Sequence, residues 1–120
     1  MPLEFLDFDF SDDNQGHGSF DAMACVTPAQ LPALEQEILR VLDWAGQEFP
    51  ARGPLEAGGE WDVQLHGTHE IATPLHVHAQ DGRLVLEPRG AGIARVTLSL
   101  TLAGTREFCE AFRGAFGVDG

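Results

Sequence analysis

Apolar and polar residues alternate in both halves of the N-terminal stretch, residues 3–26. In residues 3–10, apolar side chains are interleaved with acidic ones, and residues 19–26 keep the same rhythm. A period of two is typical of a strand with one buried and one solvated face. The intervening run of Asp, Asn and Gly favours a turn. The pattern therefore predicts a long, acidic β-hairpin over residues 3–26.

Two other segments have the three- and four-residue periodicity of amphipathic helices. The first covers residues 28–48, and the sequence Thr27-Pro28-Ala29-Gln30 before it matches a capping box. The second covers residues 106–116, where Thr105 can cap the start and Gly117 can end the helix. Each helix carries an apolar stripe that must pack against another element.

Alternation with a period of two returns in residues 61–102. Asp81-Gly82 is a typical two-residue turn of a β-hairpin, and a further strand near Ile71 is compatible with the pattern. The positions expected to point inward are Trp61, Val63, Leu65, Leu75, Val77, Ala79 and the even-numbered residues from Ala94 to Leu102.

These elements fit one domain that spans residues 1–120, in the order β-β-α-β-β-β-α. Only two helices have stripes to bury, and every strand has one apolar face. The predicted fold is therefore α+β, with a single antiparallel sheet of about five strands, both helices packed on one face and the other face open.

The charge is strongly negative and unevenly distributed. The net charge is −12, there is no lysine, and the eight acids up to Leu39 are accompanied by no arginine. Nucleic acid and anionic membrane surfaces require a cationic surface, so neither is expected as a partner. A basic protein partner fits better, although surplus acid also simply keeps a small domain soluble.

No targeting signal or membrane span is apparent in the sequence. The two cysteines, Cys25 and Cys109, are far apart and lack metal-type spacing. We therefore expect reduced thiols in a cytoplasmic protein. The sequence gives no indication of the oligomeric state.

The leading functional hypothesis is a non-catalytic binding or regulatory module. Asp7, Asp9 and Asp21 are expected on the outer face of the hairpin, where they could contact a basic protein. Small acidic bacterial proteins of the immunity and antitoxin kind work in this manner, and the uneven charge supports that class. Alternatively, Arg83 and Arg95 from later strands could neutralise these aspartates within the sheet.

The second hypothesis is a metal site. His66, His69, His76 and His78 fall within thirteen residues. His76 and His78 are expected on one face of a strand, with His66 and Asp62 together on the preceding strand and His69 or Glu70 in a following loop. Three imidazoles and a carboxylate suit zinc or non-haem iron. Solvated histidines on an open sheet are the simpler interpretation.

A third hypothesis places a small molecule between the sheet and the helices, near Trp44 and Trp61. No nucleophile-elbow, P-loop, dinucleotide-binding or zinc-protease motif occurs in the sequence. This favours a protein that is not an enzyme.

Overall fold

The computed structural model describes residues 2–13 and 15–118, and within them it is an α+β protein. Two strands, β1 (Asp9–Asp12) and β2 (Gly18–Val26), precede helix α1 (Leu31–Glu48) and the short 3-10 helix η1 (Leu55–Ala57). Then follow β3 (Trp61–Ala72), β4 (Leu75–Gln80), β5 (Arg83–Pro88), β6 (Ile93–Gly104) and helix α2 (Arg106–Phe116). The α+β class is as predicted, but the described residues form six strands rather than about five, because four strands instead of three lie between the two helices.

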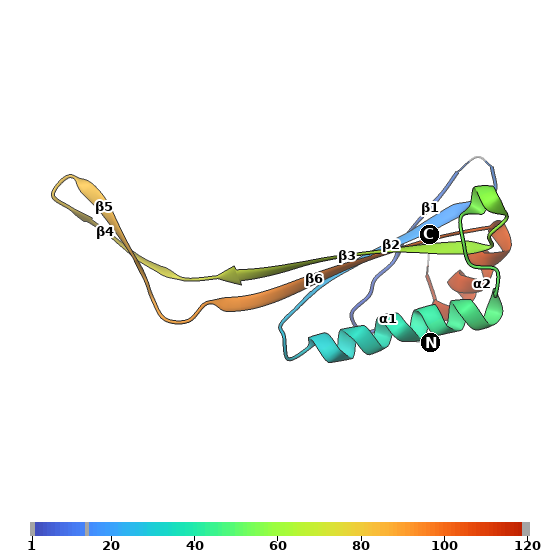
Figure 1. Ribbon diagram of the computed structural model, residues 1–120, viewed down its shortest axis with the longest axis horizontal. Coiled ribbons are helices and arrows are strands. Elements are labelled where there is room, and N and C mark those ends of the chain that lie inside the picture. Colours follow the sequence, from blue (N-terminus) through green and yellow to red (C-terminus); the bar gives the residue numbers. More distant parts are fainter. Residues whose placement is uncertain (1, 14, 119–120) are drawn as a thin grey trace.

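The strands form two sheets rather than the predicted single one. β1, β2, β6 and β3 make an antiparallel four-stranded sheet in that order, while β4 and β5 pair only with each other. In Figure 1 both helices lie on the same side of the four-stranded sheet, as predicted. Phe20 of β2 and Leu102 of β6, which face the helices, are completely buried.

The first strand is shorter than the alternation suggests. Only Asp9–Asp12 pair with β2, while residues 3–8 run as irregular chain. Leu6 and Phe8 are nevertheless buried. The segment does not need a strand partner, because the carboxylate of Glu37 in α1 accepts backbone N–H bonds from Glu4, Phe5 and Leu6.

Aromatic rings fill the space between the sheet and the helices. Phe112 of α2 packs on Phe20 of β2 with ring centroids 4.4 Å apart, and Phe108 stacks on Trp61 at 5.8 Å. α2 has the predicted bounds, and the hydroxyl of Thr105 accepts a bond from the Phe108 N–H at 3.3 Å. The side chain of Gln30 accepts the bond from Thr27 N–H expected of the capping box, although α1 itself begins at Leu31.

The strands β3 and β6 continue far beyond the helices and end in the β4–β5 hairpin (Figure 1). This gives the molecule dimensions of 66 × 30 × 25 Å. The prediction that Leu65, Leu75, Val77 and Ala79 are buried is wrong, because all four are exposed. Leu65 lies on β3, the edge strand of the sheet. The other three lie farther from the helices: twelve residues of strand reach about 40 Å, whereas the 18-residue α1 reaches only about 27 Å, so the helices cannot cover the hairpin that follows β3.

Candidate functional site

A broad hollow lies on the open face of the four-stranded sheet, at the end nearest α2. The β1–β2 turn and η1 form its two sides, and both stand on the face opposite the helices (Figure 1). Thr101 and Ala103 of β6 belong to its floor, and the volume is about 890 Å³. We call this hollow the acidic cleft, because its lining includes the four carboxylates of Asp12, Asp13, Glu56 and Asp62.

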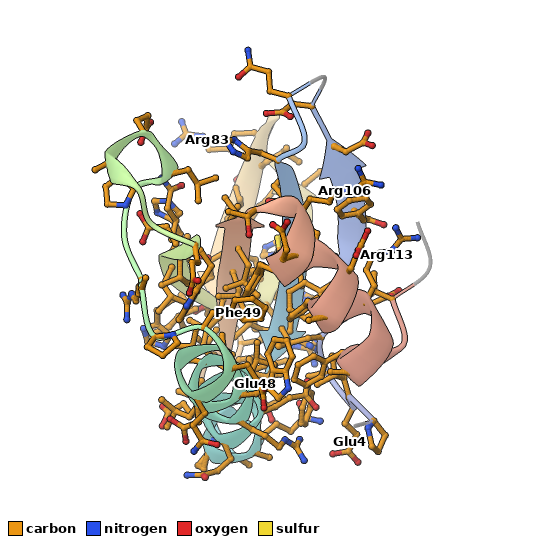
Figure 2. All side chains as sticks on the ribbon, turned by 90° about the vertical axis from the view of Figure 1, so that its right-hand side faces the viewer. Glu4, Glu48, Phe49, Arg83, Arg106 and Arg113 are labelled. Carbon is orange, nitrogen blue, oxygen red and sulfur yellow. The ribbon has the colours of Figure 1, made fainter. Side chains whose placement is uncertain are left out.

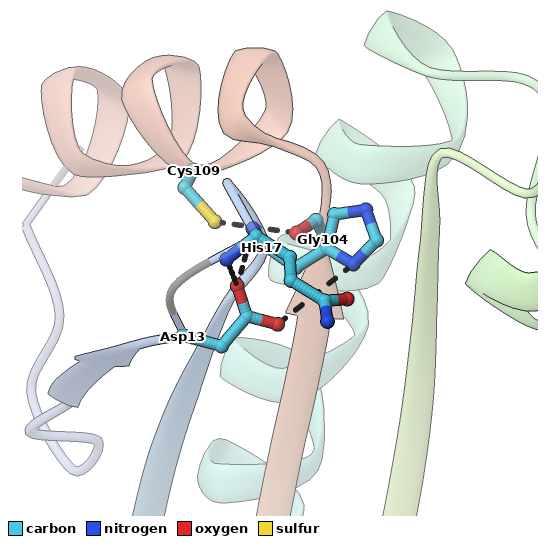
Figure 3. Close-up of polar contacts among 5 residues, drawn as sticks. Asp13, His17, Gly104 and Cys109 are labelled. Carbon is cyan, nitrogen blue, oxygen red and sulfur yellow. Dashed lines mark hydrogen bonds and ion pairs between the residues drawn. The ribbon is translucent and has the colours of Figure 1, made fainter.

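The β1–β2 turn is held in place by the side chain of Asp13. Its Oδ1 accepts bonds from the backbone N–H of Gln15 at 2.8 Å and of His17 at 2.9 Å (Figure 3). These two bonds hold the pKa of the Asp13 carboxyl below its ordinary value, and the bond from Gln15 has the larger effect. The His17 ring lies 3.9 Å from the same carboxylate. Asp13 therefore shapes this side of the cleft as well as contributing charge.

Two of the three aspartates predicted to form a binding surface border the acidic cleft. Asp9 and Asp21 are direct partners in the β1–β2 register, and Thr101 is the next residue across the sheet. The Thr101 hydroxyl donates to Asp21 Oδ1 at 2.7 Å. Asp7 is exposed, but it precedes β1 in the irregular segment and does not line the cleft.

The suggestion that Arg83 and Arg95 neutralise Asp9 and Asp21 is wrong. Arg95 pairs in register with Glu70, six residues and about 20 Å along β6 from Thr101. Arg83 belongs to the separate β4–β5 hairpin.

The remaining arginines are also engaged or placed elsewhere. Arg52 lies over the Trp61 ring at 5.5 Å and Arg113 over the Phe10 ring at 4.8 Å. Arg40 is 3.8 Å from Glu37, and Arg106 is 3.3 Å from Glu110. Among residues 2–13 and 15–118, no arginine forms an ion pair with a carboxylate of the acidic cleft or its border. Asp9, Asp12, Asp21, Glu56 and Asp62 thus remain uncompensated; we refer to them as the five free carboxylates.

The four histidines proposed as metal ligands do not converge. His66 and His69 lie three residues apart in β3 and so face opposite sides of the sheet. His76 and His78 share one face of β4, with ring centroids 5.3 Å apart. His69 and Glu70, expected in a loop, lie inside β3. No three His, Cys, Asp or Glu residues of the described chain are grouped so that they could hold a metal ion.

Trp61 belongs to the core, and Trp44 is a half-buried residue at its edge. Trp61 is 1% exposed, and its Nε1 donates to the Phe49 carbonyl at 2.7 Å. Trp44 packs against Phe108, Phe112 and Phe116. Figure 2 shows the space between helices and sheet filled with side chains. Cys25 is exposed and Cys109 buried, and both are free thiols.

The sequence pattern alone did not point to Asp12, Glu56 or Asp62 as parts of one site. Asp12 ends β1 and Glu56 lies in η1, 44 positions further along the chain, and only the folded sheet brings the two to the same end. Alternation did place Asp62 on the outer face. The signal that could have linked them is the low content of arginine in the same segments.

Comparison of the chain with models of protein families, with curated proteins and with solved structures gives no match. None of the helices in the described part of the chain is long and apolar enough to cross a membrane. The geometry of the acidic cleft is therefore the basis for a functional assignment.

Proposed function

We propose that the protein is a non-catalytic binding module whose acidic cleft receives a lysine- or arginine-rich segment of another protein. The observation that carries this proposal is the set of five free carboxylates, of which Asp12, Glu56 and Asp62 line the cleft and Asp9 and Asp21 lie beside it in the sheet. None of the seven arginines of the chain belongs to the lining. Like charges gathered without a counter-charge destabilise the free protein. A cationic partner removes that repulsion on binding.

The shape of the cleft supports a partner larger than a simple ion. Its sides are loops, its floor is formed by β-strands, and its volume of about 890 Å³ is in the range of small-molecule and peptide sites. The apolar side chain of Leu55 lies beside Glu56 in the lining. It can contact the aliphatic stem of a Lys or Arg while the charged end reaches the carboxylates.

The polar groups of the cleft suit the holding of cations better than catalysis. They are carboxylates, amides and hydroxyls, together with one imidazole, that of His17, which faces Asp13. Carboxylates accept charge-assisted hydrogen bonds from the ammonium group of Lys and the guanidinium group of Arg, and this is the role we assign to them.

The test is the binding of a fluorescein-labelled eight-residue peptide of alternating Arg and Ser, measured by fluorescence anisotropy. The triple variant Asp21→Asn/Glu56→Gln/Asp62→Asn removes three of the five free carboxylates. At a few tenths to one kcal/mol for each exposed charge, we expect about tenfold weaker binding. Binding by the unaltered protein should itself weaken severalfold from about 50 to 300 mM salt.

The matched control is Glu35→Gln/Asp43→Asn/Glu48→Gln on α1, where all three residues are exposed. It changes the net charge by the same amount but leaves the acidic cleft intact. We expect it to weaken peptide binding less than threefold. Equal losses in both triple variants would show that the peptide senses only overall charge, and the proposal would then be wrong.

A further inference from the structure

A long apolar extension is the most unusual feature outside the acidic cleft. We call residues 65–98 the arm; it comprises most of β3, the β4–β5 hairpin and the first half of β6 (Figure 1). A group of its large aliphatic side chains is between 47% and 65% exposed: Leu65, Ile71, Leu75, Val77, Leu84, Leu86 and Ile93. Soluble monomers rarely leave so many such side chains together in water.

The tip of the arm has one wholly apolar face. In the β4–β5 register, Val77 lies opposite Leu86 and Ala79 opposite Leu84, so their side chains share that face. The other face carries polar partners such as His76 and Glu87. A two-stranded hairpin is only marginally stable by itself in water. Its apolar face therefore requires a cover, and no described element of the same chain lies over it.

The exposed area matches what one protomer contributes to a stable interface. The register pairs Ile93 with Ala72, which places Ile93 on the other face of the sheet from Leu65 and Ile71. At on the order of 100 Å² for each half-exposed Leu, Ile or Val, the other six side chains offer about 600 Å². Specific protein interfaces take about 600–1,000 Å² from each partner. The arm therefore carries enough surface for a specific complex without help from the rest of the molecule.

The charge of the arm distinguishes it from the rest of the chain. Its three acids, Glu70, Asp81 and Glu87, are balanced by three arginines. The remaining 16 acids and four arginines carry the whole net charge of −12. An arm can therefore lie on an identical arm without net repulsion, whereas contact between two other regions of this chain would bring like charges together.

From these observations we propose that the arm binds the arm of a second copy of the chain, with the two arms antiparallel about a twofold axis. This arrangement is self-complementary, as a closed dimer requires. Because the molecule is 66 Å long, it places the two acidic regions at opposite ends. Their separation then greatly exceeds the Debye length of about 8 Å, so their repulsion is screened. The inference does not depend on the acidic cleft.

Sedimentation velocity of the full chain tests this proposal. At about 50 µM we expect twice the monomer mass, with dissociation on dilution. The variant Val77→Thr/Leu84→Thr/Leu86→Thr places β-branched Thr, which suits strands, at all three positions but removes the apolar face. Because each substitution acts in both protomers, the three together should weaken association by at least about a thousandfold, so this variant should be monomeric.

The matched control, His76→Thr/His78→Thr/Glu87→Thr, alters the opposite face of the same hairpin. It should remain a dimer. Near-ultraviolet circular dichroism of the buried Trp61 reports whether the core of each variant is folded. Hydrogen exchange of the unaltered protein adds a test that needs no variant: protection of β4 and β5 should increase with protein concentration.

Monomeric behaviour at about 200 µM, with exchange in β4 and β5 independent of concentration, would overturn the proposal. If that monomer floated with phosphatidylcholine vesicles, the arm would be a lipid-binding element instead. If the threonine variant of the arm is monomeric but still binds the Arg-Ser peptide, the acidic cleft is intact in it. The proposal for the arm and the proposal for the cleft can therefore be tested separately.

Discussion

Glu37 offers a sharp test of how the N-terminal segment is held. Its carboxylate is 2% exposed, yet its Oε2 accepts bonds from Phe5 N–H at 2.9 Å and Leu6 N–H at 2.7 Å, and its Oε1 accepts the Glu4 N–H. The substitution Glu37→Gln keeps the size of the side chain. It replaces one oxygen by an NH2 group, which then faces a backbone donor instead of accepting from it.

The expected loss follows from these three bonds. A hydrogen bond to a charged group contributes about 1.5–3 kcal/mol, and one to a neutral group about 1 kcal/mol. Glu37→Gln weakens two such bonds and leaves the third donor without an acceptor. We therefore expect the free energy of unfolding to fall by about 2–4 kcal/mol. The loss cannot exceed about 5 kcal/mol, because residues 3–8 can instead detach from the core. Detachment exposes Leu6 and Phe8, which costs roughly 1.5–3 kcal/mol for each side chain.

Urea unfolding followed by the emission of the two core tryptophans measures this difference. Hydrogen exchange should also accelerate at the amides of Glu4, Phe5 and Leu6. Glu35→Gln is the control, because Glu35 is exposed on the same helix and should change stability by less than about 0.5 kcal/mol. A Glu37→Gln variant as stable as the unaltered protein would refute the role assigned to this carboxylate.

Two further predictions concern the thiols and a glycine. Burial raises the pKa of the Cys109 thiol to about 11, so this thiol should stay protonated at pH 8 and react with a thiol reagent only when the protein unfolds. The exposed Cys25 should react at once. Equal reaction rates of the two thiols would contradict this prediction. A Cβ at Gly104 would overlap the ring of fully buried Phe108, so Gly104→Ala should cost about 1–3 kcal/mol in urea unfolding. At the exposed position Gly46 of α1, an added methyl group meets no other atom, so Gly46→Ala should instead raise the free energy of unfolding by about 0.5–1 kcal/mol. Equal effects of the two substitutions would refute the steric explanation.

Local patterns in the sequence were sufficient to predict those features of the structure that depend only on residues close together in the chain. The bounds of α2 agree with its cap and terminal glycine, and Gly117 has the positive φ of 65° expected of a left-handed C-cap. The Asp81-Gly82 turn likewise has φ values of 53° and 77°. Alternation also correctly placed Asp9 and Asp21 opposite one another on the outer face. These features are set by backbone sterics and by side chains within a few residues.

Glu37 shows what the helical pattern left undecided. It lies three residues after Leu34 and four before Val41, both of which are completely buried, so its position on the inner face was visible in the sequence. Its partners were not, because they are backbone groups more than thirty residues away that periodicity does not describe. The same reason applies to Asp12 and Glu56, which meet at the acidic cleft only because the sheet brings β1 and η1 to one end.

By itself, the sequence determined which residues share a face of each strand and helix, and therefore the α+β class. Tertiary structure alone decided which of those faces are covered. The alternation in β4 resembles that of a buried strand, yet Leu75 and Val77 are about half exposed, since two helices rising about 1.5 Å per residue cannot span strands that rise about 3.3 Å. A hydrophobic pattern shows that one face of an element is apolar. Only the three-dimensional arrangement shows whether another element of the same chain buries that face.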